Sequence, residues 1–184
     1  MGLLTPWAYL HRLYEIDIET LERQGVKTLL LDADNTITTW NNPDIDEQVL
    51  DWFARLHRSS LRGCIISNNS AERLRDIADN LGLPFVAKAK KPLPFGFWRA
   101  IREMEGTRKT TMMVGDQLFT DVLGARLAGL PAILLEPIST AREFRGTRLN
   151  RMMERVVKKS ILKKLAKQPP RFETAFSAAD KKRD

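Results

Sequence analysis

Five short apolar segments, separated by stretches with helical periodicity, are the feature that most limits what this chain can fold into. Each segment is apolar almost throughout, instead of alternating between apolar and polar residues. Continuous apolarity is what a strand needs when helices cover both of its faces. We therefore predict strands over residues 27–33, 62–67, 84–87, 110–114 and 131–135.

Helices are predicted in the intervals between these strands. Val49 and Trp52, for example, keep the spacing of one helix face. Gly82, Gly106 and Gly129 stand where helices are expected to stop. Strands that alternate with helices of this length predict an α/β fold with a doubly wound parallel sheet. The predicted helices cover residues 46–59, 70–82, 94–105 and 117–128.

Charge divides the 184 residues into a body and a basic C-terminal part. The net charge is +7, but residues 141–184 carry 14 Lys and Arg against 5 Asp and Glu, so the body is slightly acidic. From residue 149 apolar side chains recur at helical spacing between the basic ones. We predict a core domain over 1–140, a basic amphipathic helix over 141–166 packed on or appended to the core, and a flexible tail over 167–184.

Cysteine content and hydropathy exclude several classes of protein. Cys64 is the single cysteine, so the chain has no internal disulfide and no cysteine-based metal site. No apolar run approaches the ~18 residues that a membrane span needs. The N-terminal residues lack the pattern of a signal peptide. We expect a cytoplasmic protein, with the basic segment leaving room for a peripheral association with the membrane.

Acidic side chains follow the first predicted strand. Asp32 and Asp34 are two residues apart in an extended segment, so their side chains project the same way. Such a pair is costly unless a cation or a shared proton offsets the repulsion. In doubly wound sheets the site forms at the carboxyl ends of the strands, which is where this pair is expected.

The next three predicted strands also end in polar groups. Ser67 and Asn68 follow the second strand, just ahead of a helix N-terminus, a position suited to phosphate. Lysines follow the third strand, and a glycine turn with two acids follows the fourth. The residues concerned are Lys88, Lys90, Lys91, Asp116 and Asp121. Each feature alone is weak, but the ordered set indicates one site.

Phosphoryl transfer through an aspartyl phosphate is the chemistry that uses this set. A hard divalent cation such as Mg²⁺ prefers oxygen ligands and would screen Asp32 from an anionic phosphate. A lysine and fixed N–H and O–H donors would stabilise the charge that spreads over the phosphoryl oxygens. Asp34 could protonate the leaving oxygen and then accept a proton from water.

The order of these motifs resembles the phosphatase branch of the haloacid dehalogenase (HAD) superfamily. More closely, four segments together resemble the YqeG family of HAD phosphatases, subfamily IIIA, over about residues 10–165. They are DADNT (32–36), ISNNS (66–70), AKKP (89–92) and VGDQLFTDVLGARLAG (114–129), followed by a basic segment.

The resemblance implies a role for each matching residue. Asp32 is expected to be the nucleophile, and Asp34 the general acid and base with its backbone carbonyl on Mg²⁺. Ser67 and Lys91 are expected to bind the phosphoryl group. The implied metal site consists of Asp32, Asp34, Asp116 and Asp121, the last as an acid that orients Asp116.

Several of these positions have a structural interpretation as well. Asn35, Thr36 and Asn68 are predicted to bind substrate, but Thr36 could equally fix its loop and Asn68 could shape a turn. Asp121 could brace the helix that begins beside it.

The identity of the phosphate-pairing lysine is also open. Lys91 is preferred because Pro92 follows it, as in the family pattern. Lys88 and Lys90 are near enough in sequence to stay alternatives.

Spacing predicts that the core carries no cap domain. Asp34 and Ser67 are 33 residues apart, and Ser67 and Lys91 are 24 apart. Neither interval holds an independent domain, which starts near ~50 residues. An open site favours a bulky or surface-presented phosphomonoester: a lipid head group such as phosphatidylglycerophosphate, whose mitochondrial phosphatases the family also resembles, a phosphoprotein or a nucleic acid.

Residues 148–167 have three interpretations: a solvated face, contact with an anionic membrane surface, or contact with RNA. The alternative to a phosphatase is a receiver-like or non-catalytic phospho-Asp module that binds RNA or an anionic membrane through this segment. Asp34 favours turnover, because a receiver does not need an acid two residues after its phosphorylated Asp.

Overall fold

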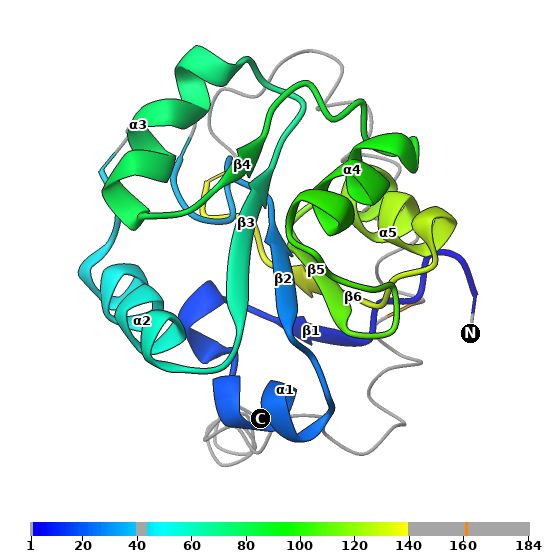
Figure 1. Cartoon of the computed structure of the whole chain (residues 1–184), viewed down its shortest axis with the longest axis horizontal. Coiled ribbons are helices and arrows are strands. Elements are labelled where there is room, and N and C mark those ends of the chain that lie inside the picture. The colour runs from blue at the N-terminus through cyan, green and yellow to red at the C-terminus, as the bar shows by residue number, and fades with distance from the viewer. Residues whose placement is uncertain (1, 40–43, 140–160, 162–184) are drawn as a thin grey trace, which may run out of the picture.

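A six-stranded, all-parallel sheet forms the centre of the molecule in the computed structural model of the chain, which describes residues 2–39, 44–139 and 161 (Figure 1). The strand order is β1-β6-β5-β2-β3-β4. The strands are β1 (Ala8–Leu10), β2 (Thr28–Leu31), β3 (Arg62–Ile66), β4 (Phe85–Val86), β5 (Thr111–Gly115) and β6 (Ala132–Leu135).

Helices cover both faces of this sheet. In Figure 1, α2 and α3 lie on one side of the strands and α4 and α5 on the other. A 3₁₀ turn, Leu13–Glu15, precedes α1, and a π-helical turn, Leu118–Val122, precedes α5. The α-helices are α1 (Ile18–Arg23), α2 (Glu47–Arg58), α3 (Ala71–Leu81), α4 (Phe95–Glu103) and α5 (Leu123–Ala128).

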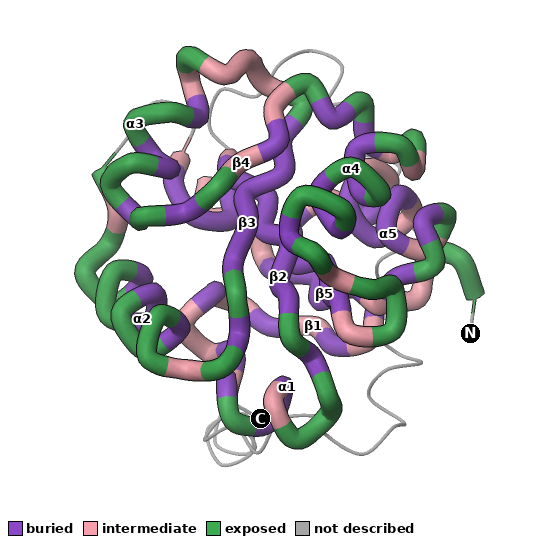
Figure 2. Tube along the Cα trace, viewed as in Figure 1, coloured by how far each residue is buried: buried purple, intermediate pink, exposed green. Residues whose placement is uncertain are grey.

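Side chains on the strands alternate between two apolar cores, one on each face. Leu29 and Leu31 of β2 pack with α1, α2 and α3, whereas Leu30 packs with α4 and α5. Figure 2 shows the strands buried and the outer helix surfaces exposed. Because both faces are covered, both sets of side chains must be apolar, which is why the strands read as continuous apolar runs.

The five predicted strands and four predicted helices are all present. The segment predicted as one helix over 117–128 begins with the π-helical turn and becomes α-helical only from Leu123. Gly82 and Gly129 end helices in the left-handed conformation, as predicted. Gly106 does not, because α4 has already ended and Glu105 takes the positive φ, 51°.

The N-terminal elements β1 and α1 were not predicted. Strand β1 has three residues and is held at the sheet edge by parallel pairing with β6, a long-range contact that no local pattern announces. The segments predicted as a basic helix (141–166) and a tail (167–184) lie outside the described residues, except Ile161, which is buried against α4, α5 and β6. In the described part of the chain, no helix has the length and apolarity that a membrane span requires.

Strand β2 marks the point where the chain reverses its direction across the sheet. From β2 the chain proceeds to β3 and β4 on one side, then crosses back to β5 and β6 on the other. Parallel sheets open a crevice at the carboxyl ends of the strands at such a reversal. The residues that follow β2 therefore stand where a ligand can enter between neighbouring loops.

Candidate active site

Asp32 lies at this reversal point, immediately after β2. Its backbone N–H donates to the carbonyl of Val114 at 2.9 Å, which continues the pairing with β5. The side chain is buried, with 7% of it exposed. Backbone pairing thus fixes a carboxylate that has little access to water.

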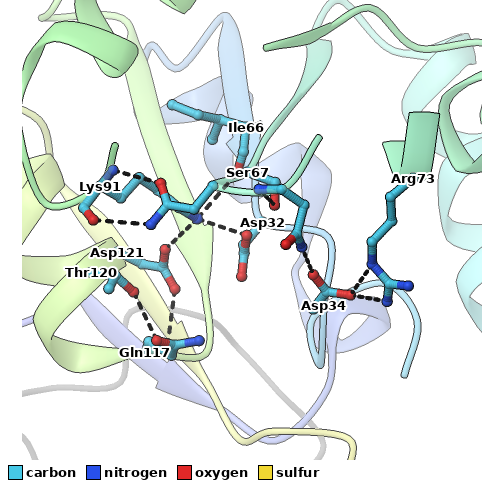
Figure 3. Close-up of polar contacts among 11 residues, drawn as sticks. Asp32, Asp34, Ile66, Ser67, Arg73, Lys91, Gln117, Thr120 and Asp121 are labelled. Carbon is cyan, nitrogen blue, oxygen red and sulfur yellow. Dashed lines mark hydrogen bonds and ion pairs between the residues drawn. The ribbon is translucent and has the colours of Figure 1, made fainter. Parts of the chain in front are cut away.

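Lys91 is the buried cation of the site. Its Nζ donates to Asp32 Oδ1 at 2.7 Å, to Asp121 Oδ1 at 2.7 Å and to the carbonyl of Ile66 at 3.1 Å (Figure 3). Lys88 and Lys90 are exposed instead. Of the three lysines that the sequence left open, the geometry brings Lys91 to Asp32.

Asn68 and Gly96 hold the segment that carries Lys91. The Asn68 side chain donates to the Lys91 carbonyl at 3.0 Å and accepts from its N–H at 2.6 Å. A Cβ on Gly96 would lie 2.8 Å from the Cβ of Ala89, so only glycine lets α4 pack this closely on the segment. The Asn68 amide, predicted to bind substrate, is engaged here in positioning the lysine backbone.

The two acids after β5 complete a carboxylate cluster. Asp116 is buried directly after the strand, and Asp121 is buried in the π-helical turn. The N–H of Gln117 donates to Asp121 Oδ2 at 3.0 Å, so this acid also braces the start of its helix. A Cβ on Gly115 would lie 2.7 Å from the Cβ of Asp121, which shows how closely the backbone approaches that side chain.

Burial and neighbouring charges act differently on the pKa of Asp32 and on that of Lys91. Burial raises the pKa of the Asp32 carboxyl from its ordinary value near 3.8 to about 7, against the lowering effect of Lys91. Burial by itself would lower the pKa of Lys91, but the carboxylates of Asp121 and Asp32 raise it above the usual value. The lysine therefore stays charged.

Ligand atoms of Asp32, Asp116 and Asp121 all lie within 4.8 Å of one another. Three buried carboxylates and one lysine leave an excess of negative charge when all are ionised. Carboxylate oxygens are the ligands that hard divalent cations prefer. The three carboxylates fit a divalent metal, which would neutralise the negative charge that Lys91 alone does not.

Asp34 points away from this cluster. Its Oδ1 accepts from Nη2 and Nε of Arg73, the latter at 3.2 Å, and its Oδ2 accepts from Nδ2 of Asn69. In Figure 3 the Asp34 carboxylate lies toward Arg73, on the side of Asp32 remote from Lys91. Among the described residues, the cluster of possible metal ligands does not include the Asp34 carboxylate.

Sequence reasoning paired neither Arg73 nor Asn69 with Asp34. One signal was available for Arg73: it lies in the first turn of α3, where the helix dipole disfavours a cation. A basic residue in that position needs a local anion, and Asp34 provides it.

Ser67, Asn35 and Thr36 line the same strand ends. Ser67 is buried, and its Oγ accepts from the N–H of Asn69 at 3.2 Å. Asn35 is buried in the left-handed conformation, with φ 59°. Thr36 Oγ1 is buried and makes no hydrogen bond within the described residues. Their expected contacts with substrate stay predictions.

The sequence of this chain matches the model of a known protein family. The model of haloacid dehalogenase-like hydrolases covers residues 6–129, which include every strand from β1 to β5 and all the acids of the site. The chain belongs to the haloacid dehalogenase-like hydrolases.

The chain is also similar to individual phosphatases. The chain is 34% identical over 159 residues to "Probable phosphatase YqeG" of Bacillus subtilis (strain 168), covering 86% of this chain and 92% of that protein. It is 27% identical over 159 residues to the chloroplastic and mitochondrial phosphatidylglycerophosphate phosphatase 1 of Arabidopsis thaliana, covering 81% of this chain and 45% of that protein. The prediction of a HAD-family phosphatase related to YqeG is confirmed.

The fold is similar to a solved HAD structure as well. The magnesium-bound HAD-hydrolase YfnB of Bacillus subtilis superimposes with a TM-score of 0.53 at 13% identity, covering 71% of this chain and 98% of that one. At this identity the likeness concerns the fold.

Proposed function

We propose that this HAD phosphatase is a Mg²⁺-dependent phosphomonoesterase that works through an aspartyl phosphate on Asp32. The observation that carries the proposal is the buried group of Asp32, Lys91, Asp116 and Asp121 at the carboxyl ends of β2 and β5. It joins a fixed nucleophile to a charged lysine and to the ligands that a hard cation needs.

In the first step Asp32 attacks phosphorus while the bond to the leaving oxygen breaks. Lys91 Nζ, 2.7 Å from Asp32 Oδ1, is placed to contact a phosphoryl oxygen beside that carboxylate. The Ser67 hydroxyl is the predicted second donor. Asp32, Asp116 and Asp121 would hold Mg²⁺, with the Asp34 backbone carbonyl as a further predicted ligand, and the bound ion would supply charge that offsets the repulsion between nucleophile and substrate.

Asp34 moves the protons. As an acid it protonates the leaving oxygen, and as a base it takes a proton from the water that attacks phosphorus in the aspartyl ester. This second step releases inorganic phosphate and restores the Asp32 carboxylate. Arg73 and Asn69 donate three hydrogen bonds to the two Asp34 oxygens, which offer about four acceptor sites, so one site stays open to a proton.

We infer that the substrate is bulky or presented on a surface, and favour a lipid phosphomonoester of the phosphatidylglycerophosphate type. Two points support this choice. The sequence intervals leave no room for a cap domain that would enclose a small metabolite. One relative is a phosphatidylglycerophosphate phosphatase. Phosphoproteins and nucleic acids are the other substrates of this class to test, and residues 148–167 stay a predicted contact with an anionic membrane or RNA.

Turnover of p-nitrophenyl phosphate with and without Mg²⁺ tests the proposed function. We expect wild-type activity only with Mg²⁺, and a loss on the order of 10⁵-fold or more in Asp32→Asn, because no other described group replaces the nucleophile. A [³²P]phosphoenzyme trapped in acid from wild type but not from Asp32→Asn would support the intermediate. Phosphorylation of Asp32 without release of phosphate would instead support the receiver-like alternative, and Mg²⁺-independent turnover would contradict the proposal.

A further inference from the structure

Three large apolar side chains are exposed next to the segment that carries Lys91. Leu93, Phe95 and Trp98 are 48%, 65% and 38% exposed, and they fall within six residues. Single exposed apolar side chains are ordinary, but several within one short segment are typical of an interaction surface. We call Leu93, Phe95 and Trp98 the apolar patch.

The packing of α4 explains why the apolar patch faces outward. Phe97 and Ala100 of this helix are buried against the sheet, which directs Phe95 and Trp98 to the opposite side. Their rings meet edge to face, with centroids 5.6 Å apart. The Trp98 Nε1 donates to the carbonyl of Ala128 at 3.3 Å, so this ring is held in place at the surface.

Exposed basic residues lie close in sequence to the apolar patch. From residue 85 to residue 102 the chain has five Lys and Arg and no Asp or Glu, but Lys91 is buried against acids of the site and Arg99 pairs with Glu103 at 2.8 Å. Lys88 and Lys90 are exposed, and within the described residues neither forms an ion pair. The Arg108 guanidinium lies 5.4 Å from the centroid of the Trp98 ring. The surface therefore combines exposed aromatic groups with the charges of Lys88 and Lys90, which no acid among the described residues pairs with.

The backbone ties this surface to the mouth of the site. The N–H groups of Lys88 and Ala89 donate to the carbonyls of Asn69 and Ser67, at the carboxyl end of β3. The N–H of Leu93 donates to the carbonyl of Lys90 at 2.9 Å, which closes a turn around Lys91. The same turn thus exposes Lys90 and Leu93 and sends Lys91 inward to Asp32.

We propose that the apolar patch, with Lys88 and Lys90, docks the protein on an anionic lipid bilayer and turns the site toward it. This inference rests on the proposed lipid phosphomonoester substrate. Aromatic and aliphatic side chains enter the boundary between head groups and acyl chains, while lysines contact anionic head groups. A substrate embedded in that bilayer would then reach Lys91 without leaving the membrane.

Vesicle sedimentation of the full chain tests the docking surface. We expect binding to vesicles that contain phosphatidylglycerol and much weaker binding to phosphatidylcholine alone. Leu93→Ser combined with Phe95→Ser should lower the partition coefficient at least about tenfold. Lys88→Gln combined with Lys90→Gln should lower it about fivefold per charge.

Matched controls lie on α2, on the other face of the sheet. Leu50→Ser removes an apolar side chain that is 39% exposed, and Arg55→Gln with Arg58→Gln removes two exposed charges. Both controls should sediment like wild type. Circular dichroism melting of every variant shows whether it is folded.

Trp98 provides a second readout. Brominated acyl chains in the vesicles should quench its fluorescence, and Trp98→Phe should lose most of the quenching. Absence of quenching, or unchanged sedimentation of the patch variants, would overturn the inference. So would a dimer of the wild type that Phe95→Ser dissociates, if vesicles are not bound.

The docking surface and the proposed function fail separately. Mg²⁺-dependent turnover of p-nitrophenyl phosphate without vesicle binding would overturn the docking surface and leave the phosphatase mechanism standing. Vesicle binding that depends on the patch, without any turnover, would do the reverse.

Discussion

Asp32 and Asp34 differ by two positions in the chain and stand in different surroundings, with side chains that are 7% and 14% exposed. Asp32 is buried against an ammonium group that is itself 3% exposed, whereas Asp34 pairs with an arginine whose side chain is 29% exposed. The backbone of Asp32 is hydrogen-bonded to β5, whereas Asp34 lies further along the loop after β2, in an isolated bridge with Thr38. The difference is consistent with the proposed roles, a nucleophile held in place and a proton-transferring acid in a more open setting.

The largest effect expected from this comparison is on catalysis by Asp34. Asp34→Asn should lower turnover by a factor on the order of 10²–10⁴, since an amide can neither donate the proton nor accept one. The loss should be smaller for p-nitrophenyl phosphate than for an alkyl phosphate, because nitrophenolate leaves without needing a proton. Steady-state kinetics with both substrates measure this. An equal loss with the two substrates would contradict the role as general acid.

Besides its proposed contact with the phosphoryl group, Lys91 should stabilise the buried side of the site. Lys91→Met leaves Asp32 and Asp121 without their shared cation, and removing one partner of a buried ion pair costs about 3–5 kcal/mol. Urea unfolding without divalent ions measures the loss, and saturating Mg²⁺ should restore part of it. Lys88→Met is the matched control, because an exposed lysine should change the free energy of unfolding by no more than about 0.5 kcal/mol. A similar small change in both variants would show that the buried cluster is not electrostatically strained.

The pKa of Asp32 predicts how stability depends on pH. Because the folded pKa is about 7 and the ordinary value is 3.8, the folded state binds more protons than the unfolded state between these limits. The free energy of unfolding of the metal-free protein should therefore fall as pH rises through this window, by up to about 4 kcal/mol. The measurement is the difference between wild type and Asp32→Asn at each pH. A difference that stays constant or rises with pH would contradict the buried environment of Asp32.

The surroundings of Asp32 were the more predictable of the two. The order of motifs predicted that Asp32, Lys91, Asp116 and Asp121 serve one site, because carboxyl ends of parallel strands meet at one edge. Which lysine reaches the acids could not be predicted from spacing. That choice depends on the hydrogen bonds of Asn68 and on the turn after β4, both of which are tertiary contacts.

The contacts of Asp34 were harder to predict for the same physical reason. Arg73 and Asp34 are 39 residues apart and belong to different elements, and nothing in either local sequence pairs them. Strand β1 is a similar case, since its three residues depend on β6 for every backbone partner across the sheet. Periodic apolar patterns identify elements that bury a face, but short edge strands and rim contacts leave little periodicity to detect.

Arg73 should have the smallest effect, and one confined to catalysis. We expect Arg73→Met to lower kcat about tenfold with little change in KM, because a positioning residue acts on Asp34 and not on the binding of substrate. Stability should change by less than about 1 kcal/mol, since the pair is partly exposed to solvent. Arg73→Lys, which keeps the charge but not the two N–H donors to one oxygen, should recover part of the rate. A rise in KM with unchanged kcat would instead mean that Arg73 contacts the substrate directly. The contrast between the buried Asp32 and the more open Asp34 would then lose its structural basis.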